Sequence, residues 1–201
     1  MEKTYTRKHQ ILDTSAKLFR EKGFEATTMR DIATEMNMEA ASLYHHIKSK
    51  EQILEEICFT MADKLIISIK DVNDIYFNAA ERLQSVIKNH IEILTGHPDY
   101  SIVFLHEWRS LQEPRLAEFK ALRDKYENEL KAIIADGINE DIFEDVDQKF
   151  ASLSILSTLN WVPEWYRANG GMSPAQIAIK LGEFIMGGLS KKLVTDLNYK
   201  P

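Results

Sequence analysis

The chain has 201 residues, of which 44% are hydrophobic and 28% are charged, and its formal net charge at pH 7 is −6. These values are typical of a globular protein of one or two domains. The apolar runs are too short to cross a bilayer, and the first residues lack the apolar stretch of a signal peptide, so we expect a protein of the cytoplasm that does not enter membranes. The single cysteine, Cys58, excludes an intrachain disulfide, and we expect it to be buried as a small hydrophobic residue.

The charge is distributed unevenly along the chain. Residues 1–50 contain 9 Lys and Arg against 7 Asp and Glu, which gives +2. Residues 51–201 contain 16 against 24, which gives −8, and together the two parts reproduce −6. A basic N-terminal part can face phosphate groups even though the whole chain is acidic.

The first part of the chain predicts helices that begin and end at recognisable residues. A first helix covers residues 6–22 and ends at Gly23, where a left-handed residue is favourable. Thr28 is in the position of an N-cap for a second helix, and Asp31 supplies the acid of a capping box three residues later. This second helix ends at Asn37, because asparagine tolerates the left-handed region.

The remaining pattern is also helical, and no convincing strand periodicity interrupts it. A short third helix is predicted at 39–47 and a long fourth helix from Ser49 onward. Further helices are predicted at 75–94, 99–111, 115–138, 147–165 and from Ser173, which caps a helix with Pro174 in its first position. The fold class is therefore all-α with nine helices: a three-helix helix-turn-helix domain at 1–50 and a six-helix domain at 51–201.

The second and third helices form a helix-turn-helix in which the short third helix keeps one face free. That face carries Ser42, Tyr44, His45 and His46, which are small, aromatic or hydrogen-bonding residues with little acid among them. An α-helix fits the major groove of DNA, where the base edges can be distinguished, and flanking groups hold the phosphates. The sequence therefore predicts a double-stranded DNA partner for this part of the chain.

The runs Thr-Met-Arg-Asp-Ile-Ala at 28–33 and Ser-Leu-Tyr-His-His-Ile-Lys-Ser-Lys-Glu at 42–51 resemble the DNA-binding domain of the TetR family of bacterial repressors. The resemblance covers residues 7–57. It implies a homodimer that binds a palindromic operator and releases it when a small molecule enters the C-terminal domain. It also departs from the usual family pattern, with Asn37 in place of the turn glycine and Glu39 in place of a small residue.

The resemblance assigns roles to individual residues of the motif. Phosphate-contacting positions are matched by Thr28, Tyr44 and Lys50. Positions that face or approach bases are matched by Arg30, Ala40, Ser42 and His45. A metal site at His45 and His46 is disfavoured, because adjacent histidines on a helix point apart and no third ligand is suitably spaced. We expect no metal, no cofactor and no catalytic residue.

Two segments of the second domain contain all three tryptophans of the chain. The candidates for an effector site in them are Phe104, His106, Trp108, Arg109, Asn160, Trp161, Trp165 and Tyr166. Such aromatic residues are either core packing or the wall of a small-molecule pocket, which is mostly apolar with a few placed polar groups.

These segments resemble a subgroup of the TetR family that senses acyl-coenzyme A thioesters of fatty-acid, steroid or phenylacetate breakdown. The resemblance implies an acyl-coenzyme A effector, whose phosphates would require basic side chains. The candidates are Arg109, Arg115, Lys120, Arg123 and Arg167. Two alternatives remain: a repressor that senses cationic drugs or another hydrophobic molecule, and, in a different class, a helical enzyme acting on acyl thioesters.

The last two long helices are the predicted dimer interface, because in the family they form a four-helix bundle with their symmetry mates. Leu181, Phe184 and Ile185 would supply apolar area, and Gly188 would permit close approach of the helices. A two-fold dimer also supplies the two recognition helices that a palindrome requires.

Overall fold

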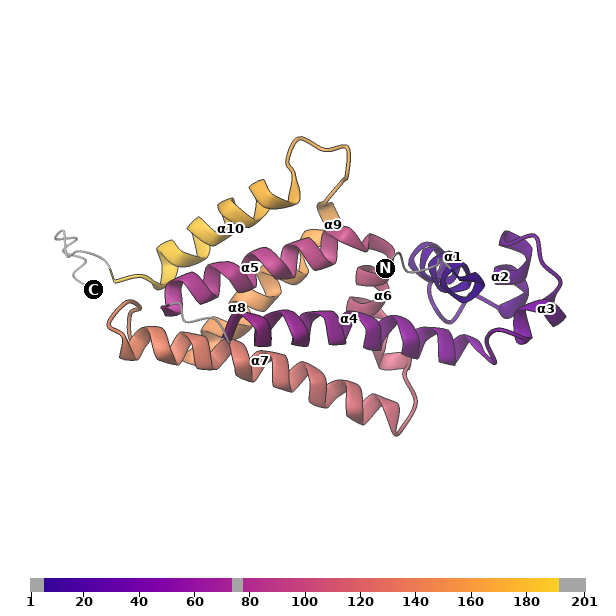
Figure 1. Ribbon diagram of the computed structural model, residues 1–201, viewed down its shortest axis with the longest axis horizontal. Coiled ribbons are helices and arrows are strands. Elements are labelled where there is room, and N and C mark those ends of the chain that lie inside the picture. The colour runs from indigo at the N-terminus through magenta and orange to yellow at the C-terminus, as the bar shows by residue number, and fades with distance from the viewer. Residues whose placement is uncertain (1–5, 74–77, 192–201) are drawn as a thin grey trace, which may run out of the picture.

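The computed structural model describes residues 6–73 and 78–191, which form ten α-helices and one 3-10 turn and contain no β-strand (Figure 1). An isolated bridge between Phe143 and Ser190 is the β-type pairing within this part of the chain. Helices α1–α3 lie at one end of an elongated molecule, and the other helices form a larger body (Figure 1). The predicted all-α class is confirmed.

The small end of the molecule is built from α1 (Arg7–Lys22), α2 (Met29–Glu35) and α3 (Ala40–Tyr44). The predicted capping box is present: Thr28 Oγ1 accepts from Asp31 N, and Asp31 Oδ2 accepts from Thr28 N. One apolar residue or more from each helix is fully buried, namely Ile11, Phe19, Ile32, Leu43 and, just beyond α3, Ile47. The three helices therefore share one core.

The third helix is shorter than the predicted 39–47 and ends at Tyr44. The backbone N–H of His46 bonds to the carbonyl of Leu43 at 3.0 Å, which is the tighter i to i−3 pattern that commonly ends a helix. Ile47 remains buried, and its N–H also bonds to the carbonyl of Leu43 at 3.1 Å, so both the apolar periodicity and this last bond extend past Tyr44.

The body consists of long helices arranged along the molecular axis, with shorter ones at the side that faces α1 (Figure 1). Their bounds are α4 (Lys50–Asn73), α5 (Ala79–Gly96), α6 (Pro98–His106), α7 (Arg115–Asn139), α8 (Gln148–Asn160), α9 (Val162–Trp165) and α10 (Pro174–Leu189). Helix α4 packs against α1 at one end and against α5, α6 and α7 along its length, so it connects the two parts of the molecule.

Two predicted helices are divided in the structure. The predicted helix at 147–165 is α8 followed by α9, and Pro163 in the first turn of α9 lacks the N–H that a continuous helix would use. The predicted helix at 99–111 is α6 followed by a 3-10 turn at Trp108–Ser110. The predicted start of the preceding helix at residue 75 lies outside the described residues, and α5 begins after its N-cap Asn78.

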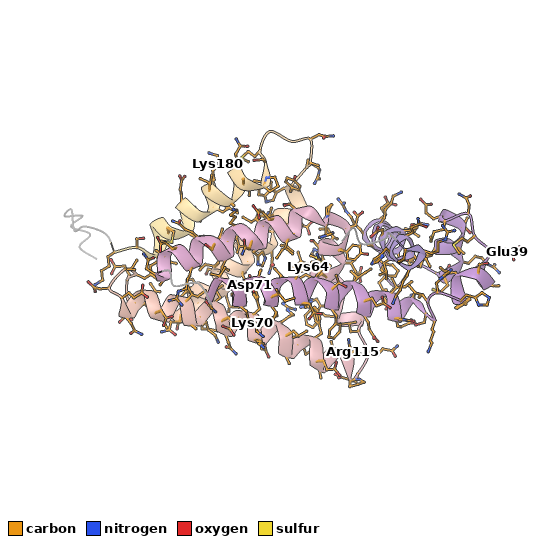
Figure 2. The ribbon with its side chains drawn as sticks, in the orientation of Figure 1. Glu39, Lys64, Lys70, Asp71, Arg115 and Lys180 are labelled. Carbon is orange, nitrogen blue, oxygen red and sulfur yellow. The ribbon has the colours of Figure 1, made fainter. Side chains whose placement is uncertain are left out.

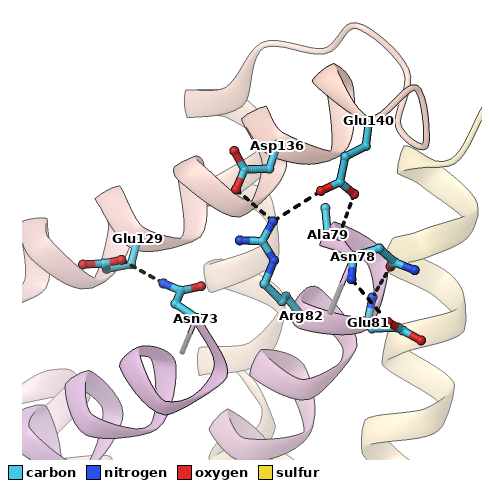
Figure 3. A network of polar contacts seen from close by, with 8 residues as sticks. All are labelled: Asn73, Asn78, Ala79, Glu81, Arg82, Glu129, Asp136 and Glu140. Atoms are coloured by element: carbon cyan, nitrogen blue, oxygen red, sulfur yellow. Dashed lines mark hydrogen bonds and ion pairs between the residues drawn. The ribbon is translucent and has the colours of Figure 1, made fainter. Parts of the chain in front are cut away.

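A polar network ties α5 to α7 at the end of the body farthest from α1–α3 (Figure 3). Arg82 Nη2 lies 2.8 Å from Asp136 Oδ2 and 3.6 Å from Glu140 Oε1. The other oxygen of Glu140 accepts from the backbone N–H of Ala79 at 2.8 Å. The first turn of α5 is thereby fixed to the last turns of α7.

Cys58 lies on the buried face of α4, as expected. Burial, together with the negative charge of Glu107, raises the pKa of its thiol to about 12. None of the helices in the described residues combines the length and apolar character that a membrane span needs.

Candidate DNA-binding surface and effector cavity

The turn between α2 and α3 is held by backbone geometry. Asn37 has a φ of 52°, in the left-handed region, and the N–H of Met38 bonds to the carbonyl of Ala33 at 2.8 Å. Asparagine adopts this conformation more readily than most non-glycine residues, so Asn37 can replace the glycine usual in the family. The turn therefore sets the position of α3 against the core.

Exposed side chains of α3 and of the turn that follows it form what we call the recognition surface: Ser42 and Tyr44 on α3, and His45 and His46 just beyond it. Tyr44 is 52% exposed although its neighbour Leu43 is fully buried. Ala40 is half-buried against the core, and Glu39 lies at the outer tip of the molecule (Figure 2). A polar, unpartnered helix face next to a rigid turn suits insertion into the major groove.

The other residues assigned to DNA differ in how freely they can reach it. Arg30 is exposed at the start of α2. The hydroxyl of Thr28 donates to Asp31 Oδ2 at 2.6 Å, and this bond and the backbone bond hold the pKa of Asp31 below its usual value. Lys50 Nζ donates to the carbonyls of Phe24 and Glu25 at 3.0 and 3.2 Å, so its charge already has partners within the protein.

The body contains a cavity of about 460 Å³ between α4, α5, α6, α7 and α8. Of the predicted effector residues, Phe104, Trp108 and Asn160 line it. Its lining is divided between polar or charged residues and apolar ones, with Leu65, Ile66, Leu105, Leu122, Leu153 and Leu156 among the apolar side chains.

The structure does not bring the other predicted effector residues to this wall. His106 lies outside it and pairs with Glu164 at 2.6 Å. Trp161 is 63% and Trp165 40% exposed, and Tyr166 is half-buried against the core. His106 lies in the last turn of α6 between the lining residues Leu105 and Trp108, but its side chain turns to Glu164. Arg109 is also outside the cavity lining. Trp161, Trp165 and Tyr166 follow the end of α8, where the helix expected from the sequence is interrupted.

Two arginines stack on one cavity tryptophan. The guanidinium carbons of Arg109 and Arg123 lie 4.5 and 4.4 Å from the centre of a Trp108 ring. Burial, and then repulsion by Arg109, lower the pKa of Arg123. Neither arginine has a carboxylate within 4.0 Å among the described residues. Lys120 adds a third positive charge to the lining.

The remaining basic candidates are occupied elsewhere. Arg115 forms ion pairs with Glu55 and Glu118 and stacks on Phe59 at 3.7 Å, at the end of α7 shown in Figure 2. Arg167 donates to two backbone carbonyls of its own segment. Of the five basic candidates, Lys120 and Arg123 line the cavity, and Arg109 reaches it through its contact with Trp108.

Five polar residues of the cavity lining were not among the predicted candidates, namely His90, Asp124, Tyr126, Glu127 and Ser157. His90 and Tyr126 contact each other. His90 Nδ1 lies 2.9 Å from the Tyr126 hydroxyl, and its Nε2 lies 3.1 Å from Asn160 Oδ1. Burial lowers the pKa of His90 to about 4, so the ring is neutral near pH 7. The signal available in the sequence was a single histidine on the apolar stripe of α5, between Ile87 and Ile91.

The cavity and the small domain are connected through α6. Arg20 of α1 pairs with Asp99 at 2.7 Å, and the Tyr100 hydroxyl donates to Asp13 at 2.9 Å. At the other end of α6, Glu107 Oε1 accepts from the backbone N–H of Phe24 at 3.2 Å. Helix α6, which forms part of the cavity wall, therefore contacts both α1 and the loop before α2.

Exposed apolar side chains lie on α8 and on α10, namely Phe150 and Leu153 on α8 and Ile179 and Phe184 on α10, and Phe150 and Phe184 are each 74% exposed. Leu153 also lines the cavity. Of the predicted dimer residues, Gly188 is exposed with Phe184, and Leu181 is half-buried. Ile185 is only 7% exposed, because it lies on the side of α10 that packs against α5 within the same chain. Exposed apolar side chains gathered on these two helices indicate an interface.

A helix-turn-helix with a free second helix, attached through a long helix to a cavity-bearing helical body, defines a transcriptional regulator of the helix-turn-helix class. Two family models match the chain. The model for bacterial regulatory proteins of the tetR family matches residues 11–57, and the model for the tetracyclin repressor-like C-terminal domain matches residues 77–189. The chain belongs to the TetR family of bacterial regulatory proteins and is a transcriptional regulator.

Individual relatives match over almost the whole chain. The HTH-type transcriptional repressor KstR2 of Mycobacterium tuberculosis is 30% identical over 93% of this chain and 94% of its own. The structure of that ketosteroid transcriptional regulator has a TM-score of 0.90 at 28% identity and covers 94% of this chain and 98% of its own. AibR, in complex with isovaleryl coenzyme A and operator DNA, has a TM-score of 0.79 at 30% identity, with coverage of 89% and 97%.

Proposed function

We propose that the protein is a homodimeric repressor that leaves a palindromic operator when an acyl-coenzyme A thioester of fatty-acid or related carbon-source breakdown enters the cavity. A regulator of bacterial operators acts in the cytoplasm, where the operator and such thioesters occur together. The observation that carries the proposal is the pair of arginines on Trp108, at the cavity, neither of which has a carboxylate within 4.0 Å among the described residues. Asp124 and Glu127 of the cavity lining are the carboxylates whose charges act on Arg123.

The guanidiniums of Arg109 and Arg123 both lie over Trp108 and repel one another, so an anion bound near them would be stabilised by both charges. The repulsion acts on Arg123, whose pKa it lowers together with burial. A phosphate accepts paired hydrogen bonds from a guanidinium, so a phosphate of coenzyme A would relieve the repulsion of Arg109 and Arg123. The adenine has an aromatic surface near Trp108 on which to stack.

The acyl group requires a separate, apolar space, and the cavity supplies it. Its volume of about 460 Å³ falls within the range of ~300–1,000 Å³ that is usual for small-molecule sites. Phe104 and Trp108 both pack around Phe119, with ring centres 5.7 and 5.9 Å away, so this part of the wall is rigid. AibR, whose structure was solved in complex with isovaleryl coenzyme A and operator DNA, supports the same class of effector.

The exposed apolar side chains of α8 and α10 support the homodimer. Phe150, Leu153, Ile179 and Phe184 would be covered by the same side chains of a second chain, as a two-fold interface requires. Two recognition surfaces would then face successive turns of the major groove. Thr28, Tyr44 and Lys50 remain our candidates for phosphates, and Arg30, Ala40, Ser42 and His45 for bases.

Release follows if the effector favours a position of α6 that fits DNA poorly. Phe104 and Trp108 line the cavity on either side of Glu107, which holds the loop at Phe24. A shift of α6 would therefore move α1 and the loop before Thr28. A hundredfold loss of operator affinity requires about 2.7 kcal/mol of coupling between the two sites.

The test is titration of the pure protein with a panel of acyl-coenzyme A thioesters and free coenzyme A by calorimetry, followed by operator release measured by fluorescence anisotropy. We expect one thioester class to bind and to release DNA. Arg123→Met and Arg109→Met should each weaken that thioester at least about tenfold. Arg115→Met is the matched control, because its charge is already paired with Glu55 and Glu118, and it should change the affinity little.

If no thioester binds, the acyl-coenzyme A effector is wrong. A second candidate is a cationic drug, which Asp124 in the cavity lining favours. Glu127 also lines the cavity, but Lys149 and Lys131 neutralise it and lower its pKa. Binding of a cationic dye that is lost in Asp124→Asn, without binding of any thioester, would select this candidate.

The enzyme alternative has a separate test. Within the described residues no cluster of three or more metal-binding side chains is present. The neutral His90 has Tyr126 and Asn160 as partners and no nucleophilic Ser or Cys. We expect no hydrolysis of a bound thioester, and turnover that is lost in His90→Gln would restore the enzyme hypothesis.

A further inference from the structure

The cavity contains a polar cluster made of His90 from α5, Tyr126 from α7 and Asn160 from α8. His90 and Tyr126 are buried, whereas Asn160 is half-buried. Both ring nitrogens of His90 are used, with Tyr126 at 2.9 Å and Asn160 at 3.1 Å. The three residues also line the cavity, together with apolar side chains.

The buried tyrosine determines the direction of these hydrogen bonds. His90 is neutral, so one ring nitrogen donates and the other accepts. The Tyr126 hydroxyl has His90 as its hydrogen-bond partner, and a buried O–H without an acceptor is costly. Tyr126 therefore donates to Nδ1, and Nε2–H donates to Asn160 Oδ1.

This arrangement leaves the Asn160 amide nitrogen without a protein partner. Its oxygen faces His90, and no hydrogen bond from Nδ2 is formed within the described residues. Among the described residues, the fully buried polar side-chain atoms without a hydrogen-bond partner are Ser15 Oγ, Asn73 Oδ1 and Arg82 Nε. Asn160 Nδ2 is not one of them, so this unpaired nitrogen is accessible and not enclosed in the core. Asn160 thus presents a fixed N–H donor on a cavity wall.

We propose that this donor reads a carbonyl oxygen of the effector, so that the acyl part of the effector carries a hydrogen-bond acceptor inside the cavity. The proposal rests on the proposed effector cavity and specifies the chemistry recognised there. A saturated alkyl chain beside Asn160 would displace water from the N–H without replacing its hydrogen bond, and this lowers affinity. A carbonyl in the same place would accept that bond.

The carbonyl has two sources, the thioester group itself and an oxo group farther along the acyl chain. Three matched ligand comparisons separate them. Decanoyl-coenzyme A is compared with S-decyl-coenzyme A, in which a methylene replaces the thioester carbonyl. The 5-, 7- and 9-oxodecanoyl thioesters are compared with decanoyl-coenzyme A. The corresponding free oxodecanoates are compared with decanoate, because these acids test the cavity without coenzyme A.

Two variants remove the donor in different ways. Asn160→Asp keeps an oxygen for His90 and removes the N–H, so the fold should be retained. Asn160→Leu removes both and leaves His90 Nε2–H unpaired, so its unfolding midpoint is measured alongside. Ser157→Ala is the matched control, because Ser157 lines the same cavity one turn earlier on α8.

We expect the wild type to bind the carbonyl member of one comparison about tenfold more tightly. Asn160→Asp and Asn160→Leu should abolish this ratio, and Ser157→Ala should keep it. If an oxodecanoate binds more tightly than decanoate but no thioester binds, the result would support the Asn160 N–H as a donor to a carbonyl and would reject the acyl-coenzyme A effector. Equal affinities in every comparison, absence of binding to every probe, or a ratio that survives in both Asn160 variants would overturn the inference.

Discussion

Glu107 accepts a hydrogen bond from the backbone N–H of Phe24 at 3.2 Å, and this bond joins the wall of the cavity to the loop that precedes the DNA-binding helices. The same loop is held from the other side by Lys50, the first residue of α4, through the carbonyls of Phe24 and Glu25. The loop is therefore contacted by Glu107 at the end of α6 and by Lys50 at the start of α4. A movement of either helix would be transmitted to the loop.

Replacing Glu107 should uncouple effector binding from operator release. In Glu107→Ala the Phe24 N–H loses its acceptor, so movement of α6 is transmitted less well. We expect the effector to change operator affinity at least about fivefold less than in the wild type, a loss of about 1 kcal/mol of coupling. Operator affinity with and without the thioester, measured by fluorescence anisotropy, checks this. Glu107→Gln keeps an acceptor oxygen and should respond normally, and equal loss in both variants would contradict the role of the hydrogen bond.

Lys50 and Lys48 should behave differently although both lie near the recognition surface. Lys50→Met removes two hydrogen bonds and a contact of 4.4 Å with the Phe24 ring, so we expect a loss of about 1–2 kcal/mol in the free energy of unfolding. Lys48→Met should leave stability within about 0.5 kcal/mol, because Lys48 is exposed. Urea unfolding measures both. Equal stability of the two variants would show that Lys50 acts only through DNA.

His90 should make the protein acid-sensitive. Its pKa is lowered from 6.5 to about 4 in the folded state, so below pH 6.5 the unfolded state binds a proton that the folded state does not. The free energy of unfolding should fall as the pH drops from 6.5 to 4, by about 2 kcal/mol at pH 5 relative to pH 7.5. Urea unfolding of His90→Gln should lack this part of the loss. His46→Gln, on the exposed recognition surface, is the control and should keep it; the same pH dependence in both variants would contradict the prediction.

Phe184 should be required for dimer formation. A glutamate at this 74% exposed position would place a charge among the exposed apolar side chains, where it would be desolvated on association. We expect Phe184→Glu to be monomeric by light scattering and to bind the operator at least about tenfold more weakly, because one half-site is lost. Ile67→Glu alters an apolar residue of α4 that is 58% exposed and should remain dimeric. Dimers in both variants would place the interface elsewhere.

The sequence by itself determined where those helices begin whose first turn is capped by a neighbouring side chain. Thr28 with Asp31 and Ser173 with Pro174 begin α2 and α10 as predicted, because a cap satisfies backbone N–H groups within three residues of itself. The recognition surface was also predictable, since Leu43 and Ile47 had to be buried and thereby turned Ser42 and Tyr44 outward.

Only the tertiary structure decided which residues meet at the cavity and which charges are already paired there. His90, Tyr126 and Asn160 come from three helices and are up to 70 positions apart, so no local pattern connects them. Such contacts depend on how helices pack, and sequence periodicity fixes which face is buried without fixing the partner it is buried against.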